Sequence, residues 1–244
     1  MKIVLAFISF MIGGQVFADS QEPDSIKIVQ VRASGTGCND STARAVLSPD
    51  GKTFSVFMDH YSAAADPAFT LDRKSCTLNV QVQASPGWSF SLSSADYRGF
   101  ITAEAGSQVS HQVLYAFDGS APPNERPGFE NSKGRYSFLQ KVFNGPMNND
   151  YFIHNVIDPS VQLWSSCSGS SPTSLFIQTF LISRIYSPGS QAEITLDTVD
   201  GSLAQQFSWS WKRCGNSYQP KPPTVGPAPM PGRGGGRRPP RFPN

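Results

Sequence analysis

The sequence has few of the residues from which common catalytic and metal sites are built. It contains three histidines, and none of its four cysteines is spaced as in the paired Cys-x-x-Cys knuckles of zinc sites. The Gly-x-Ser-x-Gly turn of many serine hydrolases and the calcium-binding EF-hand spacing are also absent. The sequence therefore assigns no catalytic residue, no metal ligand and no cofactor.

Long apolar runs are missing as well. The opening stretch, MKIVLAFISFMIGGQVFADS, places a lysine before a short apolar segment and then small residues, which is the order of a secretory signal peptide. No later segment reaches the roughly 18 to 20 apolar residues that a spanning helix needs. We expect residues 1–18 to be a signal peptide cleaved after Ala18, and the protein to be secreted or extracytoplasmic without a transmembrane segment.

Export changes the meaning of the cysteines, because an oxidising compartment favours disulfides over free thiols. The even count leaves no cysteine without a partner, but four cysteines allow three connectivities. We favour a pairing in which each disulfide closes a loop within one half of the chain. The two pairs are Cys38 with Cys76 and Cys167 with Cys214.

The end of the chain, residues 219–244, contains nine prolines, five basic residues and no acidic residue. Such a stretch buries too little apolar surface to offset its ordering entropy, so we expect a disordered tail. Apart from Lys2 and this tail, 14 basic residues stand against 18 acidic ones, which makes the body acidic. Secretion argues against nucleic acid as the partner of the tail, and the same charge attracts anionic polymers or headgroups. The candidate contact residues are Arg233, Arg237, Arg238 and Arg241.

The body, residues 19–218, shows no sustained helical period. Apolar and polar residues alternate in short runs, for example at 78–83, 88–93 and 206–211, which places the apolar side chains on one face of a strand. Further strands are expected at 26–34, 43–47, 53–60, 99–105, 109–117, 135–143, 151–157, 174–186 and 192–198. The Ala-rich stretch 61–68 is expected to form at most one helical turn. These features predict a single all-β domain, an antiparallel β-sandwich of about a dozen short strands with two disulfides.

The stretch GTGCNDS at residues 35–41 invites two functional interpretations. A phosphate-binding glycine loop needs a helix directly after it, but residues 43–47 form a predicted strand. A nucleophilic Cys38 needs a free thiol beside a histidine, which a paired cysteine does not offer. We interpret the stretch as a corner between two strands that Cys38 holds in place.

Six separated motifs occur together in this chain. They are GTGC at 35–38, LSPDG at 47–51, SCTLNVQV at 75–82, PGWSFSLSSADYRGF at 86–100, WSSC at 164–167 and WSWKRC at 209–214. In order and spacing they resemble the secreted proteins grouped as domain of unknown function 4360, over about residues 28–214. The resemblance implies an extracellular, disulfide-bonded domain in which the four cysteines belong to the family pattern and the basic tail lies outside it. It implies no activity.

These observations favour a secreted, non-enzymatic binding or envelope-associated protein. The expected partner is a carbohydrate or an anionic cell-surface polymer. Exposed aromatic residues would offer a sugar-stacking platform, although their alternation with serines favours the core. The candidates are Trp88, Trp164, Trp209, Trp211, Tyr61, Tyr97 and Tyr115.

Two alternatives stay open. An extracellular hydrolase of polysaccharide or peptide would need facing carboxylates in a cleft, for which Asp59, Asp96 and Glu104 are the candidates. An effector protein would block a partner through the long polar loop 118–133.

Other polar residues have mainly structural interpretations. His60, His111 and His154 are expected at surface or half-buried positions. Residues 96–99 are expected to form a conformational corner, with Arg98 paired to an acid and Gly99 supplying an unusual dihedral angle. Oxygen-rich loops would be the places for calcium. These loops are residues 197–200 and the loop with Asp118, Glu125 and Glu130.

Overall fold

The structure is a computed structural model, and it describes residues 23, 25–117, 137–160, 162–196 and 205–215. For Ser137 and Phe138 it describes the backbone alone. The expected signal peptide, the 118–133 loop, the candidate calcium loops and the basic tail all lie outside these residues. The account below concerns the described part of the chain.

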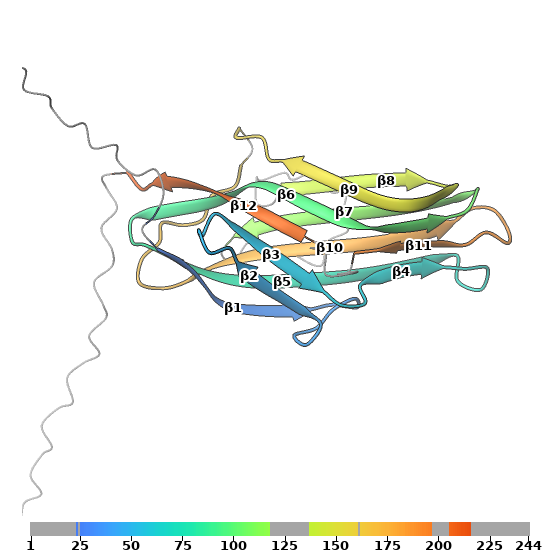
Figure 1. Cartoon of the computed structure of the whole chain (residues 1–244), viewed down its shortest axis with the longest axis horizontal. Coiled ribbons are helices and arrows are strands. Elements are labelled where there is room, and N and C mark those ends of the chain that lie inside the picture. The colour runs from blue at the N-terminus through green and yellow to red at the C-terminus, as the bar shows by residue number, and fades with distance from the viewer. Residues whose placement is uncertain (1–22, 24, 118–136, 161, 197–204, 216–244) are drawn as a thin grey trace, which may run out of the picture.

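Two antiparallel sheets are stacked face to face (Figure 1). The five-stranded sheet has the order β1 (Ile26–Ser34), β5 (Leu71–Ala84), β10 (Thr173–Ile185), β7 (Ser107–Phe117) and β8 (Ser137–Asn144). The seven-stranded sheet has the order β2 (Ala43–Leu47), β3 (Thr53–Met58), β12 (Gln205–Arg213), β6 (Trp88–Ala103), β11 (Ala192–Thr195) and β4 (Ser62–Ala65), and β9 (Met147–Val156) also pairs with β6. The prediction of an all-β sandwich of about a dozen strands is confirmed.

The strand β6 lies between two neighbours in its sheet. Ala95 pairs with Phe207 of β12 and with Asn155 of β9, so these two strands lie on opposite edges of β6. Successive side chains of a strand point to opposite faces. Tyr97 therefore enters the core, while Asp96 and Arg98 point away from it.

The core lies between the sheets and is rich in aromatic rings. The centroid of the Phe54 ring lies 4.7 Å from that of Phe207 and 4.6 Å from that of Trp209. Phe90 meets Trp209 edge-on at 5.4 Å. Burying each such side chain contributes about 1.5 to 3 kcal/mol. The alternating runs of the sequence thus supply the dry faces of the two sheets.

Some local predictions are wrong. Residues 88–93 and 99–105 were expected as separate strands with a corner at 96–99, but β6 is one strand of 16 residues. The Ala-rich stretch contains the short strand β4 instead of a helical turn. Ala63 and Ala65 are buried and pair with Ile194 and Ala192, so strand pairing and burial override helix propensity here.

His111 also departs from the prediction, because it is fully buried instead of lying at the surface. It belongs to β7, whose residues are buried on both faces over almost their whole length. Burial lowers the pKa of His111 to about 3, so the ring is neutral at physiological pH. The prediction holds for His60 and His154, which are exposed.

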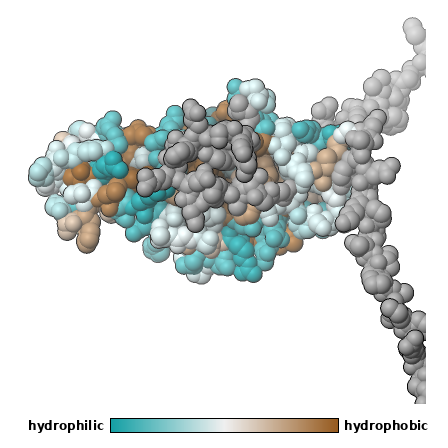
Figure 2. Space-filling model, turned by 180° about the vertical axis from the view of Figure 1, so that it is seen from behind, coloured by the Kyte–Doolittle hydropathy of each residue, from teal (hydrophilic) through white to brown (hydrophobic). Residues whose placement is uncertain are grey.

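On the face shown in Figure 2, hydrophilic residues are the more frequent among the described ones, with hydrophobic residues scattered between them. Several large apolar side chains nevertheless remain exposed. They are Val29, Val46, Phe69, Leu71, Phe100, Val142, Phe152, Val156 and Tyr186.

Candidate functional site

The GTGC motif forms the connection between β1 and β2, which belong to different sheets. Its two glycines allow close packing against neighbouring elements. A Cβ added to Gly35 would lie 2.1 Å from the carbonyl oxygen of Ser75, and one added to Gly37 would lie 2.2 Å from a ring carbon of Tyr61. The chain can therefore turn this tightly only without side chains at these two positions.

A disulfide holds this corner to β5. Cys38 is bonded to Cys76 with a Cα–Cα distance of 5.3 Å, and Cys167 is bonded to Cys214 with a Cα–Cα distance of 6.1 Å. This is the pairing that we favoured from the sequence. Because Cys38 is a buried half of a disulfide, it is not available as a nucleophile, and the interpretation as a structural corner is confirmed.

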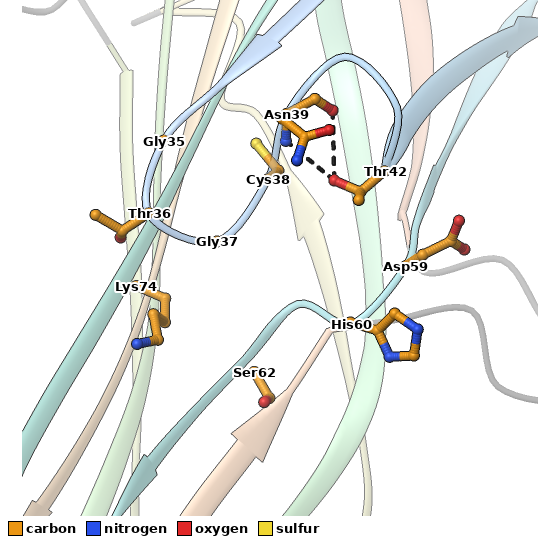
Figure 3. A pocket seen from close by; sticks show the side chains of 10 residues that line it. All are labelled: Gly35, Thr36, Gly37, Cys38, Asn39, Thr42, Asp59, His60, Ser62 and Lys74. Atoms are coloured by element: carbon orange, nitrogen blue, oxygen red, sulfur yellow. Dashed lines mark hydrogen bonds between the residues drawn. The ribbon is translucent and has the colours of Figure 1, made fainter.

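The corner borders a pocket of about 250 Å³, which we call the corner pocket (Figure 3). It opens where the β1–β2 connection meets the end of β3, the start of β4 and one residue of β5. The lining residues are Gly35, Thr36, Gly37, Cys38, Asn39, Thr42, Asp59, His60, Ser62 and Lys74. Ligand pockets usually measure about 300 to 1,000 Å³. The corner pocket therefore suits a group no larger than a single sugar residue.

The polar side chains of the corner pocket are only partly paired. Lys74 Nζ lies 3.2 Å from Asp72 Oδ1. In the described part of the chain, the side chains of Asp59, His60 and Ser62 make no hydrogen bond. His60 has a φ of 58°, a left-handed conformation that costs a residue with a Cβ about 1 kcal/mol.

Asp59, His60 and Ser62 have the residue types of a hydrolase triad without its arrangement. A triad needs the histidine to accept a hydrogen bond from the serine and to donate one to the acid. No such bond joins these side chains, and Figure 3 shows Asp59 and His60 on the opposite side of the pocket from Lys74. These side chains therefore form no triad, and the corner pocket offers them for polar contacts with a ligand.

The three carboxylates proposed for a hydrolase are not brought together. Asp96 lies in the middle of β6, and Glu104 directly follows the end of that strand. Eight residues of an extended strand span about 26 Å, whereas the carboxylates of a glycosidase are about 5 to 9.5 Å apart. Glu104 Oε2 instead accepts a hydrogen bond from the Gln191 amide. Asp59 is the sole carboxylate among the lining residues of the corner pocket.

A second candidate site lies on the outer side of β6 and β9. We call it the β6–β9 face and define it by its outward side chains, Asp96, Arg98 and Phe100 of β6 and Phe152, His154 and Val156 of β9. Phe152 is 56% exposed although it lies in a regular strand. The guanidinium carbon of Arg98 lies 5.1 Å from the centroid of the Phe152 ring. This contact orients the ring while leaving much of it accessible.

A row of polar residues lies beside the Phe152 ring and crosses the sheet. His154 Nδ1 lies 2.5 Å from Asp96 Oδ1, and the two residues are directly opposite in the register. Asp96 is also opposite Gln206 of β12, which in turn is opposite Ser55 of β3. Neighbouring strands are about 4.8 Å apart, so this row of four residues spans about 14 Å.

Residues 96–99 were expected to pair Arg98 with an acid and to use Gly99 for an unusual dihedral angle. The structure differs on both points. Arg98 stacks on Phe152, and Asp96 contacts His154. Gly99 is not among the glycines with positive φ. It is required because a Cβ would lie 1.9 Å from the Thr195 carbonyl oxygen, so β11 approaches β6 closely at this point.

Most of the seven aromatic residues considered for a sugar-stacking platform lie in the core, as their alternation with serines favoured. Trp88, Trp209 and all three tyrosines are buried, and Trp211 packs against the core. Trp164 is half-buried beneath Lys212, whose ammonium nitrogen lies 4.2 Å from the centroid of its ring.

Other predicted sites lie outside the described residues. These are the surface-contact residues Arg233, Arg237, Arg238 and Arg241, and the candidate calcium loops with Asp118, Glu125 and Glu130 and with Asp197 and Asp200. Across the described ranges, no three histidine, cysteine or acidic residues are grouped as in a metal site. The same ranges contain no helix long and apolar enough to cross a membrane.

Phe152 and Lys74 were not among the candidate contact residues named from the sequence. The alternation of residues 150–156 contains the necessary signal for Phe152, since it places Phe152, His154 and Val156 on the face opposite Tyr151 and Ile153. Lys74 had no signal, because its proximity to the GTGC motif depends on the pairing of distant segments.

Comparison with known proteins adds one sequence relative and one weak overlap with a solved structure. The chain is 28% identical over 200 residues to a protein of Arthroderma benhamiae described as an uncharacterized secreted protein, which covers 81% of this chain and 76% of the relative. It also overlaps a solved structure described as TmCBM61 in complex with beta-1,4-galactotriose. That overlap has 11% identity and a TM-score of 0.23, with 77% of this chain and 90% of the other covered, and is too weak to bear on fold or ligand.

The relative's description confirms the secreted or extracytoplasmic location predicted from the sequence. The cleavage site after Ala18 stays a prediction. A family model described as Domain of unknown function (DUF4360) matches residues 24–214, which contain both candidate sites and both disulfides. This chain belongs to that family.

Proposed function

We propose that this protein is a secreted, non-enzymatic binding protein that holds a carbohydrate on the β6–β9 face. The observation that carries the proposal is the exposed ring of Phe152, which Arg98 orients beside the Asp96–His154 pair. An exposed aromatic ring on a rigid strand offers a flat apolar surface at little entropic cost. The C–H face of a sugar ring matches such a surface.

The polar row beside the ring supplies partners for sugar hydroxyl groups. A carboxylate accepts hydrogen bonds, a guanidinium donates them, and an amide does both. Asp96 and Gln206 of this row fill the acceptor and amide roles, and Arg98 beside the row fills the donor role. Asp96 and Arg98 lie on β6, and Gln206 lies on the adjacent strand β12. A row of about 14 Å is long enough for two or three sugar residues of an extended chain.

The charges on this face favour a neutral glycan over a polyanion. Asp96 contributes negative charge and Arg98 positive charge, with His154 beside Asp96. Asp150 adds a carboxylate at the end of the face, opposite Phe100. Asp96 and Arg98 are two residues apart on one strand, about 7 Å, so the face offers hydrogen bonds from both signs without a strong net attraction for a highly charged polymer.

The non-enzymatic part of the proposal is supported by the positions of the acidic residues. Asp96 and Glu104 are about 26 Å apart along β6, too far to act on one glycosidic bond. Prolonged incubation of the protein with the bound glycan should release no new reducing ends. Release of such ends at a rate that depends on Asp96 would contradict the proposal.

Association with an envelope surface is the second part of the proposal, and it depends on the basic tail at residues 219–244. The tail carries five positive charges and no negative one, whereas the body is acidic. Such a tail adds a weak, salt-sensitive attraction to anionic polymers or headgroups.

A pull-down with insoluble polysaccharides, followed by titration with oligosaccharides of the retained type, tests the binding site. Phe152→Ala should weaken binding at least about tenfold, because a buried aromatic side chain contributes about 1.5 to 3 kcal/mol. Phe69→Ala is the matched control, since Phe69 is 73% exposed in the β4–β5 connection, outside the β6–β9 face. Equal losses in both variants, or no loss in Phe152→Ala, would exclude this face as the site.

A further inference from the structure

The corner pocket contains a modification motif that the binding proposal does not use. Residues 39–41, Asn-Asp-Ser, match the acceptor sequence for N-linked glycosylation, Asn-x-Ser/Thr with x not proline. The motif occurs once in the 244 residues. It lies in the exposed connection between β1 and β2, and N-linked glycans are carried by such surface segments of secreted proteins.

The local hydrogen bonds leave the reactive atom accessible. Asn39 Oδ1 accepts hydrogen bonds from the Ser41 amide at 2.8 Å and from the Ser41 hydroxyl at 2.5 Å. In the described part of the chain, Asn39 Nδ2 has no hydrogen-bond partner. The intervening Asp40 is turned toward β1, where it accepts hydrogen bonds from the Ala33 amide at 2.7 Å and from Arg32 Nη1 at 3.0 Å.

We propose that Asn39 carries an N-linked oligosaccharide and that the first sugar of this oligosaccharide lies in the corner pocket. The donor is an oligosaccharide joined to a polyprenol through pyrophosphate. Asn39 Nδ2 bonds to the anomeric carbon, the bond from that carbon to the pyrophosphate oxygen breaks, and the lipid pyrophosphate leaves with the electron pair. The transferase accepts the amide proton.

The pocket matches this occupant in size and chemistry. Its volume of about 250 Å³ suits one sugar residue, and Asn39 itself belongs to the lining (Figure 3). The side chains of Asp59, His60 and Ser62, which have no hydrogen-bond partner among the described residues, offer an acceptor, an imidazole and a hydroxyl group to the substituents of the sugar. The Cys38–Cys76 disulfide fixes the residue next to Asn39, so the attached sugar has little freedom to move away.

Expression of the full chain in a eukaryotic secretory host tests the modification. Treatment of the secreted protein with a peptide N-glycosidase should remove mass and convert Asn39 to aspartate in the peptide mass spectrum. Asn39→Asp is the sharpest variant, because it keeps the oxygen that caps Ser41 but lacks the amide nitrogen. Ser41→Ala should also abolish the modification, and Ser41→Thr should retain it.

Recovery of folded, secreted protein with unmodified Asn39 from that host would overturn the proposal. A glycan that persists in Asn39→Asp would overturn it as well, because the sugar would then be attached elsewhere.

The rate at which the glycosidase removes the glycan from the native protein tests the position of the first sugar. Asp59→Ala combined with His60→Gly should accelerate the native-state removal by about tenfold, which corresponds to about 1.4 kcal/mol of lost contact. His60→Gly also relieves the left-handed backbone, so the variant is expected to fold. After denaturation both proteins should be cleaved at one rate. Equal native-state rates would exclude the corner pocket as the seat of the sugar.

Discussion

Gly37 is one of the two corner glycines at which the structure leaves no room for a side chain. A Cβ at this position would overlap the ring of Tyr61, which is buried and donates a hydrogen bond to the Thr179 carbonyl at 2.7 Å. We expect Gly37→Ala to lower the free energy of unfolding by about 1 to 3 kcal/mol, the usual cost of overpacking. Urea unfolding measures the difference.

Gly215→Ala is the matched control for this substitution. A Cβ at Gly215 has no atom of the described residues within 4 Å and the φ there is not positive, so its effect should be close to zero. A Gly37→Ala variant as stable as Gly215→Ala would show that the corner has more space than the structure gives it.

His111 makes the stability of the protein depend on pH. Its pKa is about 3 in the folded protein and has the ordinary value of 6.5 in the unfolded chain, so between these values the unfolded chain binds a proton that the folded chain does not. Stability should therefore be unaffected by this residue above pH 6.5 and fall by up to about 1.4 kcal/mol per pH unit below it. Urea unfolding over this pH range measures the slope.

His111→Phe isolates this contribution, because the phenyl ring keeps an aromatic neighbour for Tyr97 and does not titrate. Tyr151 retains its hydrogen bond to the Thr195 carbonyl. Between pH 6.5 and 3, the free energy of unfolding of the variant should depend less steeply on pH, by the slope that corresponds to about one proton. An unchanged slope would mean that other groups cause the acid sensitivity.

The role of a single residue could be predicted from the sequence when that role followed from its residue type and its neighbours in the chain. The cysteines and the corner glycines were interpreted correctly, because a disulfide and a tight turn need particular residue types wherever they occur. The positions of His111 and Phe152 were not predicted correctly, because alternation separates the two faces of a strand but leaves open which face is covered. The answer for His111 depends on the other sheet, where Tyr97 of β6 and Tyr151 of β9 pack against its ring.

At the scale of elements, each disulfide joins a connection to the end or interior of a strand. Cys38 and Cys76 are 38 residues apart, and Cys167 and Cys214 are 47 apart. Loops of this size correspond to about 4 kcal/mol each when the stabilisation is ascribed to chain entropy. We expect the variant with Cys38→Ser and Cys76→Ser to lose roughly that stability and to lose the shape of the corner pocket.

Proteolysis of this double variant, compared with one lacking Cys167 and Cys214, distinguishes local from global effects. New cleavage should occur at residues 35–42 in the first variant only, because Cys38–Cys76 is the one of the two disulfides that joins that connection to β5. Cleavage there in both variants would contradict a local role for the Cys38–Cys76 bond.

The strand β6 shows why element boundaries were harder to predict than element types. The sequence SSADYRGF contains polar residues and a glycine, which favoured a corner between two short strands. In the structure β6 has β12 and then β11 along one edge and β9 along the other. Hydrogen bonding to both sides keeps such a segment extended, and no local pattern reports neighbours that are distant in the sequence.

At the scale of the whole molecule, the sandwich was predictable and the two candidate sites were not. Short alternating runs with turn residues between them already specify a two-sheet fold. The corner pocket requires residues 35–42, 59–62 and 74 to meet, and the β6–β9 face requires the register between β6 and β9. Both depend on strand order, which composition and periodicity do not determine.

The basic tail and the β6–β9 face should differ in how salt affects the contacts that they make. Removal of residues 219–244 should abolish salt-sensitive adhesion to anionic polymers while leaving neutral glycan binding unchanged, because the two contacts use different parts of the chain. Cosedimentation at increasing ionic strength measures both. Unchanged adhesion after the deletion would exclude the tail as the attachment element.

The central claim is that ligand binding takes place on the β6–β9 face. It is tested most directly by recording the aromatic and arginine NMR signals of the secreted protein during titration with an oligosaccharide of the polysaccharide that retains it. We expect the signals of Phe152, Arg98 and His154 to shift and those of Phe69 and Tyr186 to stay unchanged. Shifts confined to residues outside this face, while Phe152 and Arg98 stay unperturbed at saturation, would contradict it.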